Sequence, residues 1–226
     1  APICMEGIAV IAYGKLGSRE LGYNSDLDLI FIFEPGINPI EKDLYRGYHR
    51  LLQRMIHILT TRTSAGQLYE IDTRLRPDGR SGSTIIPLDN FVAYQLKKAQ
   101  LWEHQALVRA RVIVGSKSLE TTFNQLRRQV LCLPRKEKEL QQSVVSMRKK
   151  ISRENQRSDN NRFDLKFGYG GLVDIEFMLQ YLILRWANKH PQLVEVTESR
   201  ALIRALVETT ILNAIEGQLL DEILDK

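Results

Sequence analysis

The stretch Gly14–Phe33, GKLGSRELGYNSDLDLIFIF, decides the fold of this chain. It contains a Gly17-Ser18 turn, and Asp26 and Asp28 then alternate with leucines at the start of an apolar run. Alternate side chains of a strand share a face, so both aspartates are expected on one side and the leucines between them on the other. A small Gly-Ser turn lets backbone amides approach a phosphate closely. Paired carboxylates beside such a turn indicate magnesium-dependent phosphoryl chemistry.

The composition is that of an ordinary soluble globular protein. The 226 residues are 43% hydrophobic and 26% charged, with a net charge of +5. No apolar run approaches the roughly 20 residues that span a bilayer, so no membrane association is expected. Cys4 and Cys132 suggest neither a disulfide framework nor a zinc site, which favours the cytoplasm. The mild basic excess does not by itself indicate a nucleic-acid partner. Because Ala1 almost directly precedes a strand-like segment, we expect an excised piece of a longer protein.

The order of patterns predicts an α+β fold followed by an all-helical part. Apolar and alternating runs predict strands at 7–13, 27–33 and 68–75, and helical spacing predicts helices at 41–60, 88–97 and 102–114. After Gly115 the sequence predicts helices at 135–154, 173–186, 198–207 and 211–224. We therefore expect a mixed sheet with flanking helices in residues 1–115 and a helical bundle in residues 116–226.

A third acid lies on the last of the three expected strands. Asp72, Arg74 and Arg76 occupy alternate positions and are expected to face one side. If that side adjoins Asp26 and Asp28, the site holds three carboxylates and two guanidinium groups. Two divalent ions would then be shared between the carboxylates and a triphosphate. Asp72 would also accept the proton of an attacking hydroxyl, or activate that hydroxyl as a metal ligand.

Each of these features has a plainer interpretation. An isolated Asp-x-Asp is most often a solvated strand edge, and Arg74 and Arg76 could be exposed charges on a one-sided sheet. The apolar run after Asp28 favours the functional interpretation, because a buried strand carries two carboxylates only at a cost. Lys15 is a phosphate contact or a solvated lysine, and Ser25 binds metal-bound water or closes the turn.

The Gly-Ser turn, the Asp-x-Asp pair and the later aspartate together resemble the DNA polymerase β-like nucleotidyltransferase superfamily. Longer strings are more specific, and they are similar to the glutamine synthetase adenylyltransferase family, bifunctional bacterial enzymes of nitrogen control. These strings are GKLGSRELGYNSDLDLIFIF, LYEIDTRLRPDGRSG, WEHQALVRARVI and GGLVDIEFMLQYLILR. Together they extend over most of the chain from Gly14 to Arg185.

The resemblance implies transfer of AMP from ATP to a tyrosine hydroxyl of glutamine synthetase, with release of pyrophosphate and lowered activity of that enzyme. It implies Mg²⁺ or Mn²⁺ as the metal and the PII signal protein as a partner of the full-length enzyme. The matching positions are the metal-binding Asp26 and Asp28, the third catalytic acid Asp72, the phosphate-binding turn Gly17 and Ser18, and the RLRP arginines Arg74 and Arg76. Asp174 and Glu176 also match a family string and are expected to be structural or interface positions.

The family carries an adenylyl-removing and an adenylylating module. The segment Thr61-Arg62-Thr63-Ser64-Ala65-Gly66 and the string WEHQALVRARVI favour the adenylylating one. Family members usually show Gly-Gly where this chain has Gly17-Ser18. Three alternatives stay open: a module that removes AMP by phosphorolysis, a non-catalytic module that binds glutamine synthetase or PII, and a nucleic-acid tailing enzyme. The last of these lacks a dedicated RNA-binding signature.

Overall fold

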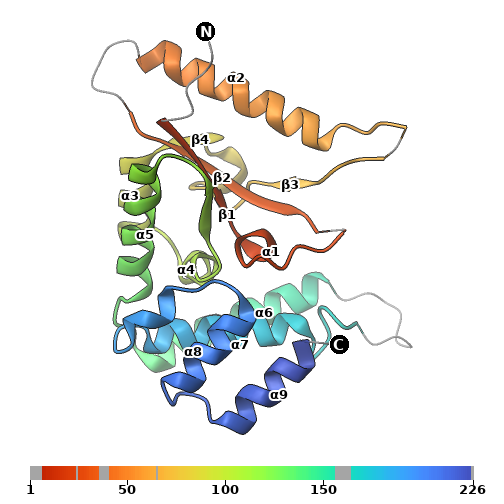
Figure 1. The fold of residues 1–226 in the computed structure, drawn as a ribbon, viewed down its shortest axis with the longest axis vertical. Helices are drawn as coiled ribbons and strands as arrows, with labels where there is room; N and C mark the ends of the chain where they lie inside the picture. Colours follow the sequence, from red (N-terminus) through yellow and green to blue (C-terminus); the bar gives the residue numbers. More distant parts are fainter. Residues whose placement is uncertain (1–6, 24, 36–40, 65, 156–163, 225–226) are drawn as a thin grey trace. The chain divides into compact units, whose positions relative to one another are not determined.

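The computed structural model describes residues 7–23, 25–35, 41–64, 66–155 and 164–224. The chain forms two compact units (Figure 1). The sheet unit comprises Ala1–Ala99 and Arg109–Arg127, and the helical unit comprises Gln100–Val108 and Arg128–Lys226. These units interleave along the chain, whereas the expected domains meet at one boundary near residue 115. The expected division into a catalytic domain (residues 1–115) and a helical domain (residues 116–226) therefore stays a prediction.

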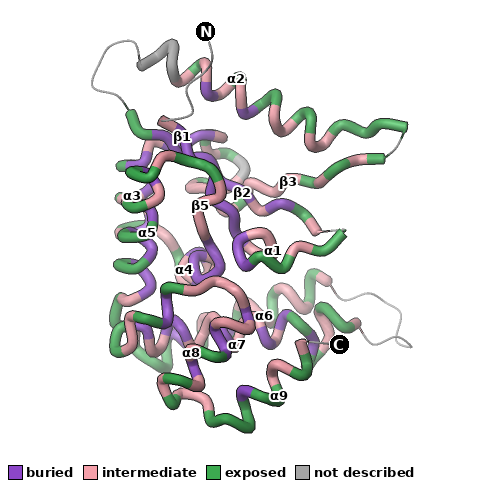
Figure 2. Tube along the Cα trace, viewed as in Figure 1, coloured by how far each residue is buried: buried purple, intermediate pink, exposed green. Residues whose placement is uncertain are grey.

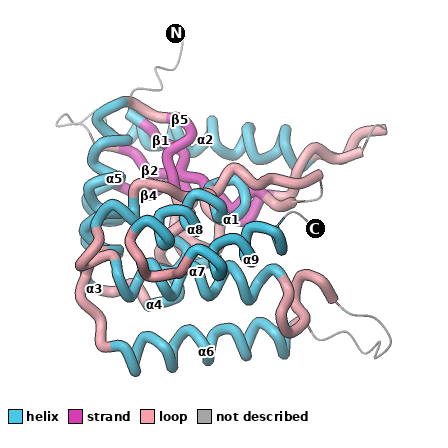
Figure 3. The backbone as a smooth tube through the Cα atoms, turned by 60° about the horizontal axis from the view of Figure 1, so that its bottom comes forward, coloured by secondary structure: helices cyan, strands magenta, loops and turns pink. Residues whose placement is uncertain are grey.

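The sheet unit is built on a mixed sheet of strands, drawn in magenta in Figure 3. Strand β1 (Ile8–Ala12) pairs antiparallel with β2 (Leu27–Phe33) on one side and with β5 (Arg111–Val114) on the other. The other edge of β2 carries β3 (Ile71–Asp72) and then β4 (Ile85–Pro87), both parallel to it. The expected mixed sheet and the α+β class are confirmed.

Helices pack against this sheet and cover part of its apolar side chains. Those of the sheet unit are α1 (Gly14–Gly17), α2 (Glu41–Thr60), the 3₁₀ turn η2 (Gly79–Ser81), α3 (Leu88–Lys97) and most of α5 (Lys117–Leu131). The bounds of α2 and α3 are those expected from helical spacing. Helix α5 was expected only as part of a generally helical region.

The alternation of side chains in β2 decides to which side of the sheet Asp28 points. Leu29 and Phe31 point into a buried cluster that includes Tyr48 and Leu52 of α2. Figure 2 shows this buried part of β2 in purple. Because side chains alternate along a strand, Asp28 points to the opposite side of the sheet from α2. Asp28 thus shares its strand with the core without entering the cluster that packs against α2.

The helical unit contains the remaining helices. They are α4 (Leu101–Leu107), α6 (Glu137–Glu154), α7 (Leu172–Trp186), the 3₁₀ turn η3 (Pro191–Val194), α8 (Ser199–Glu208) and α9 (Ala214–Leu224). Helix α7 packs against α6 and α8 and buries residues along its length, as its apolar composition predicts. No helix within the described ranges is long and apolar enough to cross a membrane.

The last helix starts later than its apolar pattern predicts. The expected helix began at 211, whereas α9 begins at Ala214. The Asn213 side chain accepts a hydrogen bond from the Glu216 amide (2.9 Å), and the Glu216 carboxylate accepts one from the Asn213 amide (2.8 Å). This reciprocal cap fixes the helix start.

The expected helix at 102–114 is wrong in its second half. Helix α4 ends at Leu107, and Arg111–Val114 forms the strand β5. Alternation of the branched residues Val112 and Val114 suits an extended edge strand. The open edge of β1 supplies the pairing partner, and this long-range pairing overrides the local helical pattern.

The expected strand at 68–75 is also wrong in extent, because β3 contains only Ile71 and Asp72. The Asp72 carboxylate accepts a hydrogen bond from the Arg74 amide (2.8 Å), and the Arg76 amide donates to the Thr73 carbonyl (3.3 Å). Such side-chain-to-backbone bonds favour turns over strands. Arg74 and Arg76 therefore lie in a turn, and their expected alternation with Asp72 on a strand face is wrong.

Substitution of Phe31 tests how much the packing of strand β2 contributes to the free energy of unfolding. Its side chain is 0% exposed, and its neighbours across the sheet are Val10 and Ile85. We expect Phe31→Ala to lower the free energy of unfolding by about 3–5 kcal/mol, because it removes buried area and leaves a cavity. Urea unfolding followed by circular dichroism measures this change. Ile58→Ala, at a side chain that is 66% exposed, is the control and is expected to change stability little.

Candidate active site

Two of the three expected acids lie opposite each other on paired strands. Asp28 of β2 is the register partner of Asp72 of β3, and the two strands are parallel. Register partners on neighbouring strands point to the same side of a sheet. The ladder continues one step beyond, where the Leu27 amide donates to the Glu70 carbonyl (2.8 Å). Asp72 was expected on a face that adjoins Asp28, and this expectation is confirmed.

An open cavity of about 370 Å³ lies beside this ladder. Its lining residues are Asp26, Glu70, Ile71, Asp72, Thr73, Arg74 and Arg76. A second cavity of about 350 Å³ shares Asp26 and Glu70 and also includes Ser25. Three carboxylates thus line the first cavity, and Asp28 pairs with one of them.

Glu70 is a site residue that our sequence reasoning missed. It precedes Asp72 by two positions in the string LYEID, the same spacing that separates Asp26 from Asp28. That repeated spacing was the signal that could have found it. Glu70 is exposed at the shared wall of both cavities. It increases the negative charge there and hence the attraction for cations.

Arg74 neutralises part of this charge. Its Nε donates to Asp72 Oδ2 (2.6 Å), and the same two side chains form an ion pair. The hydrogen bond and charge of Asp72 raise the pKa of Arg74, and the charges of Asp28 and Asp26 raise it further. All three expected acids therefore lie close enough to act on one guanidinium group. The Arg74 side chain is 65% exposed, so it can also reach a ligand in the cavity.

Arg76 serves the loop between β3 and β4. Its Nε donates to the Gly82 carbonyl (3.1 Å), and its Nη1 donates to the Thr73 carbonyl (3.1 Å) and to the Thr73 hydroxyl. These bonds join the two ends of the loop. The Arg76 guanidinium group thus shapes the cavity wall. A phosphate contact by Arg76, for which the planar fork of arginine is suited, stays a prediction.

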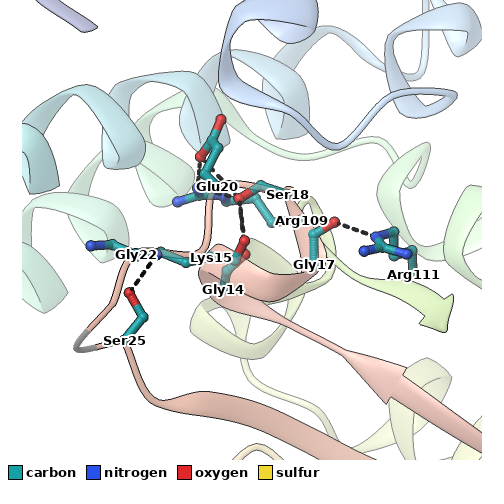
Figure 4. Close-up of polar contacts among 9 residues, drawn as sticks. All are labelled: Gly14, Lys15, Gly17, Ser18, Glu20, Gly22, Ser25, Arg109 and Arg111. Atoms are coloured by element: carbon teal, nitrogen blue, oxygen red, sulfur yellow. Dashed lines mark hydrogen bonds and ion pairs between the residues drawn. The ribbon is translucent and has the colours of Figure 1, made fainter. Parts of the chain in front are cut away.

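The Gly-Ser turn forms the short helix α1, directly after β1 (Figure 4). Gly14 has a φ of +52°, and a Cβ there would lie 2.2 Å from Asp28 Oδ2. A Cβ at Gly17 would lie 1.9 Å from the Arg109 carbonyl oxygen. Glycine is needed at both positions because the turn touches the carboxylate on one side and another backbone segment on the other.

The backbone amides of Gly17 and Ser18, which were expected to contact phosphate, donate hydrogen bonds within the turn. The Gly17 amide donates to the Tyr13 carbonyl (2.9 Å) and the Ser18 amide to the Gly14 carbonyl (3.0 Å). The Ser18 side chain is fully buried. Both amides are thus used inside the turn, and a phosphate contact by Gly17 or Ser18 stays a prediction.

Lys15 and Ser25 lie on the two sides of the same loop. Lys15 is half-buried on α1, and Ser25 lines the second cavity beside Asp26. The Ser25 hydroxyl accepts a hydrogen bond from the Gly22 amide (3.1 Å), so it closes the turn that leads into β2. Figure 4 shows this bond. A role of either residue toward phosphate or metal-bound water stays a prediction.

The acids supply the type of ligand that a magnesium ion prefers, but their side chains do not surround one common position in this structure. Among the described residues, no three histidine, cysteine, aspartate or glutamate side chains surround a common metal position. Asp72 is instead bound to Arg74. Carboxylate oxygens are the ligands that Mg²⁺ prefers, and Asp28 and Asp72 are neighbours across the ladder. The donor set therefore fits a hard divalent cation.

Asp174 has a structural place in the helical unit. Its carboxylate accepts hydrogen bonds from Arg148 Nε (2.5 Å) and from the Gly170 amide (2.6 Å). Arg148 also donates to the Phe167 carbonyl (2.9 Å). These bonds tie α6 to the loop before α7. Glu176 follows on the same helix and is half-buried.

The mixed sheet, the short helix after its first strand and the aspartates on β2 and β3 define a nucleotidyltransferase fold. Residues 4–126 match the family model described as glutamate-ammonia ligase adenylyltransferase. This match extends over more than half of the chain, and the chain belongs to that family. Residues 145–224 are similar to a second model, described as GlnD PII-uridylyltransferase.

A curated relative agrees with the family match. The chain is 46% identical over 220 residues to a bifunctional glutamine synthetase adenylyltransferase/adenylyl-removing enzyme of Nitrosococcus oceani. The alignment covers 95% of this chain and 23% of the relative. The chain therefore spans about a quarter of the length of that relative.

Substitution of Gly17 tests the close packing of α1 against the Arg109 backbone. We expect Gly17→Ala to destabilise the protein by about 1–3 kcal/mol, because the new Cβ forces α1 away from the Arg109 backbone. Chemical denaturation measures this change. Gly47→Ala is the matched control, since a Cβ at that α2 position meets nothing within 4 Å. It is expected to leave stability unchanged or to raise it by up to about 1 kcal/mol.

Proposed function

We propose that this chain transfers AMP from ATP to a tyrosine hydroxyl of glutamine synthetase, releases pyrophosphate and thereby lowers glutamine synthetase activity. The observation that carries the proposal is the pairing of Asp28 with Asp72 beside an acidic cavity. Membership of the adenylyltransferase family supports the choice of AMP and of the protein acceptor. The segment 61–66 and the string WEHQALVRARVI support the adenylylating module.

The acidic residues would hold the metal and the nucleotide. Two divalent ions, Mg²⁺ or Mn²⁺, bound by Asp26, Asp28 and Asp72 would lower the charge on the α-phosphate and stabilise the leaving pyrophosphate. Arg74 would exchange its bond with Asp72 for phosphate oxygens, which its planar fork can hold in pairs. Lys15 and Ser25 would contact the triphosphate from the α1 side of the site.

Asp72 would also receive the proton. Its carboxylate accepts the hydroxyl proton as the tyrosine oxygen forms a bond to the α-phosphorus. The bond between that phosphorus and the bridging oxygen to the β-phosphate then breaks, and pyrophosphate leaves. Before substrate arrives, the positive charge of Arg74 lies against the Asp72 carboxylate.

The wider setting is part of the same proposal. We expect the reaction in the cytoplasm, where ATP is available. We expect the PII signal protein to be a partner of the longer polypeptide. The similarity of residues 145–224 to a PII-uridylyltransferase model supports that expectation. Calorimetric titration of the longer polypeptide with PII would measure it.

The first test is AMP transfer itself. The chain is incubated with Mg²⁺, ATP labelled at the α-phosphate and unmodified glutamine synthetase, and the labelled peptide is mapped. We expect label on one tyrosine and a loss of at least about 100-fold in Asp26→Asn or Asp72→Asn, because each removes a carboxylate from the metal and nucleotide site. Asp89→Asn on α3 is the matched control, since it makes the same chemical change at an exposed position outside both cavities.

Three results would contradict this proposal. Transfer that survives in Asp26→Asn would remove the metal assignment. Release of ADP from adenylylated glutamine synthetase and phosphate, without forward transfer, would identify the adenylyl-removing module. No reaction in either direction, in the chain and in the longer polypeptide, would leave a binding module.

Arg74 allows a test of the electrostatics without turnover. Because it neutralises Asp72, we expect Arg74→Gln to bind Mn²⁺ alone about threefold more tightly, while AMP transfer falls at least about tenfold. Electron paramagnetic resonance measures free Mn²⁺ directly. Arg62→Gln, at an exposed residue of the loop before β3, is the control for net charge. Equal Mn²⁺ affinity in both variants would show that Arg74 does not act on the carboxylates.

A further inference from the structure

The side chains of two arginines contact the helix α1 and the residues that follow it. Arg109 and Arg111 alternate in the string VRARVIV, and both contact the residues of the Gly-Ser turn. Figure 4 shows Arg111 beside Gly17 and Arg109 beside Ser18 and Glu20. They lie more than 80 residues further along the chain than the turn that they contact. No pattern local to the turn predicts them.

Arg111 caps the end of α1. Its Nε donates to the Gly17 carbonyl (2.9 Å), and its Nη2 donates to the Leu16 carbonyl (3.1 Å). The last carbonyls of a helix have no partners within the helix, and a cation near them is favourable. The pairing of β5 with β1 brings Arg111 opposite Ala12, just before α1 begins. One side chain thus fixes two carbonyls of the four-residue helix.

Arg109 holds the other side of the turn. Its side chain is 5% exposed, and its Nη2 donates to the Ser18 hydroxyl and to the Glu20 carboxylate. The Ser18 hydroxyl also lies 2.9 Å from that carboxylate. Burial of a guanidinium group is costly unless it is paired, so this ion pair opposes any movement of the turn away from Arg109.

The opposite end of α1 touches the site. Gly14 approaches Asp28 so closely that a Cβ would lie 2.2 Å from Oδ2, and the Tyr13 amide donates to the Asp28 carbonyl (2.9 Å). Contacts therefore run from the two arginines through α1 to the carboxylate that pairs with Asp72. A displacement of the helix by a fraction of an ångström would alter the space beside Asp28.

We infer that Arg109 and Arg111 are positioning residues for the metal–nucleotide complex, which they serve by fixing α1 against Asp28 without touching the substrate. This inference rests on the proposed function, because it assumes that a nucleotide binds beside Asp28. A purely stabilising role for the arginines makes a different prediction. It would lower the folded fraction but leave the nucleotide affinity of the folded protein unchanged.

The test measures nucleotide affinity and stability separately. The probe is α,β-methylene-ATP with Mg²⁺, an analogue that cannot lose pyrophosphate, titrated into the chain by calorimetry at a temperature where each variant is folded. We expect Arg111→Ala to bind the analogue about tenfold more weakly, or about 1.4 kcal/mol. Arg111→Lys is expected to recover part of the affinity, because an ammonium group can reach one of the two carbonyls. Ser18→Ala tests the Arg109 side of the turn and is expected to weaken binding several-fold.

The control is Arg50→Ala, an exposed arginine on α2, which is expected to bind the analogue as the unsubstituted chain does. If Arg111→Ala does not fold, it is replaced by Arg111→Gln, which keeps part of the stem and one donor group. Unchanged affinity in the folded Arg111 variants would overturn the positioning role, even if their melting temperatures fall. Lack of binding by the unsubstituted chain would overturn this inference together with the nucleotide site on which it rests, whereas unchanged affinity in the Arg111 variants overturns the positioning role alone.

Discussion

The parallel pairing of β2 with β3 is the constraint on which the site depends. It joins two segments more than 40 residues apart and sets Asp28 beside Asp72 on one side of the sheet. The same strand β2 sends Leu29 and Phe31 into the core on the other side. Burial of these apolar side chains fixes the register, because a slip by one residue would exchange the two faces. The position of the carboxylates is thus held by hydrophobic packing that lies behind them.

Charge balance around the acids explains much of the remaining geometry. The carboxylates of the cavity repel one another, and the Arg74 guanidinium offsets part of that repulsion at Asp72. On the other side of the site, the buried Arg109 is balanced by Glu20. Each of these cations lies on a segment outside the strand β2. Opposite charges therefore meet at two places beside the paired strands: Arg74 pairs with Asp72 of β3, and Arg109 pairs with Glu20 of the loop before β2.

Local patterns predicted the elements whose signals are long and periodic. The bounds of β2, α2 and α3 follow directly from alternating or helical spacing. Local patterns failed at 102–114 and at 68–75 for two different reasons. Arg111–Val114 is a strand because β1 has an open edge, a partner that no window of neighbouring residues contains. Strand β3 is short because the Asp72 carboxylate accepts a hydrogen bond from the Arg74 amide two residues on, and this local turn bond competes with the strand pattern.

The sequence by itself determined the α+β class, the acids Asp26, Asp28 and Asp72 as candidates, and the family, because these depend on residue type and spacing. Only the tertiary structure decided that Asp28 faces Asp72, that Glu70 lines the same cavity and that Arg76 braces a loop. It alone brought Arg109 and Arg111 to the Gly-Ser turn. The physical reason is that strand pairing and buried ion pairs join residues far apart in the chain, and their partners are fixed by packing rather than by local spacing.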